Sequence, residues 1–140
     1  MLVLKMPFYG WGIGVLLWII GFCVSWIIGH YVCNYIVDEK LWPTFIRDYP
    51  DEKVNYPKGR EIVRCLGRCE LLMFTIAFIM NWPQWIAVWL GVKTSVHWYG
   101  WKKDKCRAFN IFLIGNAIII IISFLGATII KAGTPFVLNK

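Results

Sequence analysis

The chain has 140 residues, of which 59% are hydrophobic, 17% aromatic and 16% charged, and its mean hydropathy is +0.58. A soluble domain is about 45–50% apolar and about 25% charged, and so short a chain cannot hide this much apolar surface from water. The composition excludes intrinsic disorder, a nucleic-acid-binding tail and a disulfide-stapled mini-domain, and it predicts an integral membrane protein. The net charge of +7 then bears on membrane topology, and no nucleic-acid partner is expected.

Three uncharged stretches predict three transmembrane helices. Asp, Glu, Lys and Arg are absent from residues 6–37, 71–92 and 108–130, which are 32, 22 and 23 residues long. Crossing a hydrocarbon core about 30 Å thick takes about 20 apolar residues, so each stretch can cross once. The sequence predicts an all-α protein with one membrane domain over residues 1–140, spans at about 8–36, 70–92 and 108–131, and polar loops at 38–69 and 93–107.

The distribution of basic residues predicts an orientation for these spans. Three spans would put the N-terminus and the 93–107 loop on one side of the membrane, and the 38–69 loop and the C-terminus on the other. Although the raw count of Lys and Arg favours the second side by nine to six, the 93–107 loop alone holds five of them against one acidic residue. Because dense basic residues in short loops mark the cytoplasmic side, we expect the N-terminus and the 93–107 loop in the cytoplasm.

A short interfacial helix is predicted before the second span, beginning after Pro57. Arg60, Arg64 and Arg68 recur every four residues and therefore share one helix face. This arginine stripe is a candidate site for lipid phosphate. The commoner explanation is that the arginines extend to the membrane boundary without a specific ligand.

Small residues form a helix-packing seam on two of the predicted spans. In lipid, helices associate through close packing of small residues rather than through hydrophobic burial. The first span carries Gly10, Gly14, Gly21, Ser25 and Gly29 within about one third of its circumference, and the third span carries Gly115, Gly126 and Gly133 on a narrow face. These seams predict association with other subunits or with further copies of the chain, or packing of the first span on the third.

The second span holds a polar stripe around a proline. Asn81 and Gln84 flank Pro83, and Asn116 is the deeper amide of the third span. A polar group inside a span must face protein, water or a ligand, so these amides are functional candidates. A proline kink with two amides is also an ordinary packing device, and we favour that interpretation.

No catalytic arrangement is found in the sequence, and we expect no enzymatic activity. Each predicted span lacks a charged residue near its centre, whereas proton-coupled transporters usually carry an intramembrane carboxylate. The remaining candidate is a metal ion bound by residues expected on one side of the membrane, namely His30, Cys33, Cys65 and Cys69. Their spacing differs from that of common zinc motifs, and buried cysteines often serve as small apolar residues.

Together these features favour a small non-catalytic membrane protein that acts by helix association. It would be an accessory subunit of a larger membrane complex or a homo-oligomer, in contact with membrane lipid. Two alternatives remain: a pore, transporter or holin-like assembly that uses the amide stripe, and a metal- or redox-bearing subunit. No organic cofactor is expected, whereas a bound lipid is compatible with the aromatic residues near Trp82.

Overall fold

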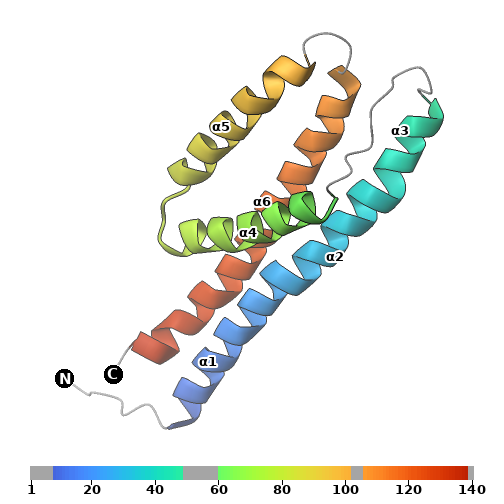
Figure 1. Ribbon diagram of the computed structural model, residues 1–140. Helices are drawn as coiled ribbons and strands as arrows, with labels where there is room; N and C mark the ends of the chain where they lie inside the picture. Colours follow the sequence, from blue (N-terminus) through green and yellow to red (C-terminus); the bar gives the residue numbers. More distant parts are fainter. Residues whose placement is uncertain (1–7, 49–59, 102–105, 139–140) are drawn as a thin grey trace.

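The computed structural model describes residues 8–48, 60–101 and 106–138, with side chains described for 12–48, 64–95 and 109–134. These residues are helical apart from a turn at residues 80–83, and none of them forms a strand (Figure 1). The predicted all-α fold is confirmed. Its elements are long helices packed side by side, with a helical hairpin laid across them (Figure 1).

The N-terminal helix is much longer than a membrane crossing requires. It runs without interruption through α1 (Phe8–Cys23), η1 (Val24–Ile28), α2 (Gly29–Cys33), η2 (Asn34–Leu41) and α3 (Trp42–Asp48), where η marks π-helical segments. At 1.5 Å per residue this helix is about 60 Å long. Residues 38–69 are predicted as a polar loop, but up to Asp48 they continue the helix, and Pro43 does not break it. Proline clashes with the carbonyl group one turn earlier, and the wider π-helical turns of η2 lie in that preceding stretch.

The long C-terminal helix α6 (Cys106–Leu138) runs antiparallel to α1 and α2, and the two predicted seams meet in this contact (Figure 1). A Cβ atom added at Gly21 would lie 2.7 Å from the carbonyl oxygen of Gly126, and one added at Gly133 would lie 2.8 Å from the carbonyl oxygen of Gly14. Only glycine permits this backbone approach. The seams are therefore used within the chain, as the packing alternative predicted.

The rest of the first-span seam packs in the same way. Ser25 and Gly29 are buried, and a Cβ atom added at Gly29 would lie 2.7 Å from Leu71 Cδ2 on α4. On α6, Gly115 is buried with only ordinary contact to Val37. Gly10 belongs to α1, but its packing lies outside the described residues.

The predicted second span is not one helix. The chain forms α4 (Arg60–Ile79), turns at residues 80–83 and returns as α5 (Gln84–Trp101). Asn81 has a φ of 58°, Trp82 N donates to Ala77 O (2.8 Å) and Asn81 N donates to Phe78 O (3.3 Å). This is a Schellman helix end with Asn81 in the left-handed position, followed two residues later by Pro83. The kink predicted at Pro83 is therefore a full reversal.

Two further predictions change with this hairpin. The short interfacial helix is the first part of α4, which continues into the apolar segment without a break. Within the described residues, two helices rather than three are long and apolar enough to cross a membrane, Gly12–Asp48 and Phe109–Thr134.

The hairpin also changes which parts of the chain share one end of the molecule. The beginning of α1 and the end of α6 lie at one end, whereas the end of α5 and the beginning of α6 lie at the other (Figure 1). The described helix ends therefore do not support the prediction that the N-terminus and the 93–107 loop lie together. The physical reason is that an additional reversal at Asn81 turns the chain back once more.

Helix α4 packs on the α1–α6 pair through a small core. Leu71 and Phe74 of α4 are almost completely buried and form a cluster with Ile119 and Ile122 of α6 and Ile86 of α5. Hydroxyl groups supply the polar contacts beside this core. Thr75 Oγ1 lies 2.9 Å from Ser25 Oγ, and Ser123 Oγ donates to the Leu71 carbonyl (3.1 Å).

Candidate functional site

A buried ion pair joins the two arms of the hairpin. Glu70 of α4 is 1% exposed, and its Oε1 atom lies 2.6 Å from Lys93 Nζ of α5. The same ammonium group also donates to Glu70 Oε2 (2.8 Å). Two charges so close and so well shielded from solvent attract each other strongly, because little water competes for them.

Two neighbouring side chains complete this polar cluster. Trp89 Nε1 donates to Glu70 Oε1 (2.8 Å), and Lys93 Nζ donates to Asn116 Oδ1 of α6 (2.9 Å). The Asn116 amide nitrogen in turn donates to the Phe112 carbonyl (2.7 Å), so both ends of that side chain are bonded. The cluster therefore links α4, α5 and α6 through one charged centre.

Burying the two charges of this cluster has a free-energy cost. Moving a carboxylate and an ammonium group out of water costs several kcal/mol per ion, and the ion pair with its extra hydrogen bonds offsets this cost. Removing one partner from such a pair typically costs about 3–5 kcal/mol, because the other charge stays buried. In apolar surroundings a pair of ionisable residues is a candidate functional site.

A second set of polar contacts lies toward the start of α4. Arg64 donates to Asp38 Oδ2 of η2 from both Nε and Nη2, each at 3.3 Å. Arg68 Nη2 lies 3.0 Å from His30 Nε2 of α2, a contact in which the ring nitrogen must be the unprotonated acceptor. Two members of the arginine stripe thus bind side chains of the same protein. The Arg60 side chain lies outside the described residues, and a lipid-phosphate role for the stripe stays a prediction.

The residues of the predicted metal site do not form a ligand set. His30 binds Arg68, and Cys33, Cys65 and Cys69 are free thiols. Among the residues that the structure describes, no three His, Cys, Asp or Glu side chains are grouped so that they could hold a metal ion.

The three predicted amides also separate. Asn116 belongs to the buried cluster, whereas Asn81 and Gln84 are exposed at the hairpin turn. The Asn81 side chain accepts a hydrogen bond from Lys131 Nζ of α6 (2.5 Å), which holds the turn against the end of the apolar part of α6. The expected continuous stripe through Asn81 and Gln84 is interrupted by the change of direction between them.

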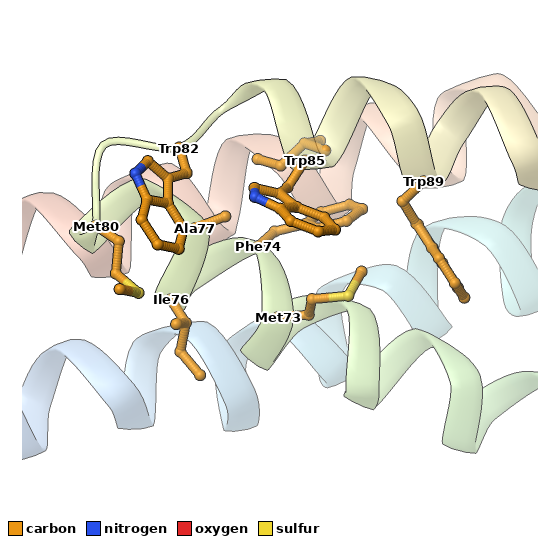
Figure 2. Close-up of a pocket in the computed structure, with 9 residues that line it drawn as sticks. Met73, Phe74, Ile76, Ala77, Met80, Trp82, Trp85 and Trp89 are labelled. Atoms are coloured by element: carbon orange, nitrogen blue, oxygen red, sulfur yellow. The ribbon is translucent and has the colours of Figure 1, made fainter.

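An apolar pocket of about 200 Å³ lies between the arms of the hairpin, near its turn. Figure 2 shows Trp82, Trp85 and Trp89 on the side of the turn and α5, with Met73 of α4 and Met80 at the start of the turn also lining the pocket. Phe74 and Ala77 form part of its inner wall, together with Ile86. Trp89 connects this pocket to the charged cluster, because its indole lines the pocket while its N–H group binds Glu70.

Sequence reasoning missed Glu70 and Lys93 as site residues because they flank the uncharged stretch 71–92. In the sequence they therefore resemble the two ends of one span. The available signal was the Asn-Trp-Pro sequence at residues 81–83, since asparagine is accepted at a helix C-terminus and proline often follows it. A reversal there brings the two ends of the stretch together.

Comparisons with protein-family models, curated proteins and solved structures find no match to the chain. The function is therefore inferred from the geometry and chemistry of the described residues.

Proposed function

We propose that the chain is a multi-pass integral membrane protein without catalytic activity that associates with other membrane subunits or with copies of itself. The two long apolar helices support membrane insertion. Large apolar side chains on their outer faces are more than half exposed, including Leu16 (56%), Ile19 (59%), Ile121 (59%) and Phe124 (54%). A soluble monomer rarely leaves such patches in water, whereas lipid accepts them.

The positions of the loops support an orientation with both termini outside the cytoplasm. The end of α3, the end of α5 and the beginning of α6 lie at the same end of the molecule (Figure 1), so the stretches 38–70 and 93–107 both contain residues at that end. They hold seven and five of the fifteen Lys and Arg residues, which leaves three for the rest of the chain. The positive-inside rule then places this end of the molecule on the cytoplasmic side. This orientation keeps the 93–107 loop where the sequence predicted it and reverses the N-terminus.

Helix α5 is the surface that we assign to association, and its exposure is the observation that carries the proposal. The seams of α1 and α6 already pack on each other, so they offer no free face. In α5, Ile86 is buried, but Val88 is 60% exposed and Val92 54%. No heavy atom lies within 4 Å of a Cβ atom added at Gly91, so a partner helix could approach α5 closely there.

Site-specific photo-crosslinking tests this assignment. A photoreactive amino acid at Val88 should give a discrete adduct with a protein subunit in native membranes. The matched control is Ile19, which is equally exposed on α1 and should give no such adduct. Equal protein adducts from both positions, or none from Val88, would contradict the choice of α5.

A second function is favoured by the buried pair of Glu70 and Lys93. Lys131 ends the uncharged stretch of α6 and binds the hairpin turn, so the turn marks one boundary of the apolar layer. Glu70 lies eleven residues before Asn81, and its carboxylate is almost completely shielded from solvent in its ion pair with Lys93. An ion pair buried in this way inside a membrane protein is typical of ion or proton transporters.

Purified protein in liposomes distinguishes the two functions. If transport is the function, a proton or ion flux should be measurable and should be lost in Glu70→Gln. If association is the function, the liposomes should stay tight. We favour association, because the exposed amides Asn81 and Gln84 line no enclosed path in the single chain.

A further inference from the structure

We infer that the apolar pocket between α4 and α5 holds an acyl chain of an anionic phospholipid whose head group binds at Lys131. The inference rests on the proposed membrane location and adds a specific ligand to it. It concerns the outer side of the hairpin turn and leaves the free face of α5 to a protein partner.

The lining of the pocket determines the apolar part of the ligand. Its walls are aromatic, aliphatic and thioether side chains. The indole N–H group of Trp89 already donates a hydrogen bond to Glu70. Met73 and Met80 are flexible and polarisable, so they can adapt to a chain that takes several conformations. A ligand group in this pocket therefore has to be apolar and needs no hydrogen bond.

The position of the pocket indicates a membrane lipid as the source of that group. Ile76, Trp82 and Trp85 line the pocket and are 47–63% exposed, so the hollow opens to the surroundings of the protein. In a bilayer these surroundings are acyl chains, and an open apolar hollow is filled by one of them. From Trp82 to Trp89 the pocket extends about 10 Å along the helix, which is shorter than one leaflet of about 15 Å.

The charge at the hairpin turn indicates an anionic head group. Asn81 lies between the pocket residues Met80 and Trp82, and its side chain holds the ammonium group of Lys131 at the turn. Lys131 is exposed and follows the long uncharged stretch of α6, where the apolar layer meets the head groups. A lipid of the leaflet next to the turn can therefore place its chain in the pocket and its phosphate at Lys131.

Native mass spectrometry of the full chain with phosphatidylglycerol or phosphatidylcholine of identical acyl chains tests the inference. We expect about fivefold greater retention of phosphatidylglycerol, the factor that one lysine near the surface contributes. Lys131→Gln should remove this preference, whereas the matched variant Lys40→Gln, at an exposed lysine in η2, should keep it. Inorganic phosphate should not displace the lipid, because it lacks the chain that fills the pocket.

Two isoleucine variants test the pocket itself. Ile76→Trp narrows the pocket and should lower lipid retention at least about fivefold, whereas Ile121→Trp, at an exposed isoleucine of α6 that does not line the pocket, should leave it unchanged. Equal retention of the two lipids by the wild type, or equal behaviour of the two tryptophan variants, would overturn the inference. If instead alkaline carbonate extracts the protein from membranes, the proposed membrane location itself fails.

Discussion

Glu70 and Lys93 lie 23 residues apart, yet their charged groups are 2.6 Å apart across the hairpin. The contact depends on the reversal at Asn81, and it ties α5 to the rest of the fold. Most of the described side chains of α5, residues 84–95, are exposed, and among them this pair and the indole of Trp89 make the polar contacts to α4. The same contact stabilises the closed hairpin. It also occupies the side chain of Lys93, which is therefore not available to a partner of α5.

The ion pair should be strongly coupled energetically. We expect Glu70→Gln and Lys93→Met each to lower the free energy of unfolding in detergent by about 3–5 kcal/mol, because each leaves a buried group without its partner. The double variant should lose much less than the sum. Unfolding titrations followed by tryptophan fluorescence measure the coupling, and additive losses would show that the two groups do not act as a pair.

Replacing the glycines in the contact between α1 and α6 by larger residues should destabilise the protein. Gly21→Leu must displace the α6 backbone near Gly126 and should lower the free energy of unfolding by more than about 1–3 kcal/mol. Gly12→Leu is the control, because no heavy atom lies within 4 Å of the added Cβ atom. Thermal unfolding in the same detergent compares them, and equal melting temperatures would contradict the packing described for the seams.

The hairpin turn should depend on backbone conformation at Asn81 rather than on its amide. Asn81→Gly keeps the positive φ accessible and should be nearly neutral, whereas Asn81→Leu should cost about 1–2 kcal/mol. Both variants lose the hydrogen bond to Lys131, so their difference isolates the backbone term. Gln84→Leu, at an exposed helical position, should change stability by less than about 0.5 kcal/mol. Equal losses in Asn81→Gly and Asn81→Leu would instead assign the effect to the side-chain bond.

The long apolar helices and their packing were predictable because they depend on local composition and helix periodicity. Runs without charge gave two of the three expected spans, and the spacing of glycine gave the faces that meet in the α1–α6 contact. Which surface each seam packs against depends on the tertiary structure. From the sequence alone, that surface could belong to the chain itself or to another subunit.

The hairpin and the ion pair were not predicted, because both depend on a single backbone angle. An uncharged run of 22 residues fits one crossing equally well, and only the left-handed conformation of Asn81 divides it. Once the run is divided, Glu70 and Lys93 change from opposite ends of a span to neighbours. The helix beyond the first predicted span was likewise not predicted, because π-helical turns before Pro43 let it continue.

Topology should follow from the additional reversal. In a cysteine-free background, single cysteines at the N-terminus and at the C-terminus should both react with an impermeant reagent in intact cells. A cysteine restored at residue 106 should be protected until the membrane is permeabilised. Termini on opposite sides would instead require an odd number of crossings and would contradict the arrangement of the helix ends in Figure 1.

The central claim is that the chain acts by association in a membrane, and native mass spectrometry of the protein released from nanodiscs prepared from its source membrane tests it most directly. We expect complexes heavier than one 16.3 kDa chain, composed of further subunits or further copies, with a variant carrying Val88→Lys and Val92→Lys on α5 reduced to the single chain. A wild-type protein found only as single chains with bound lipid would contradict the account.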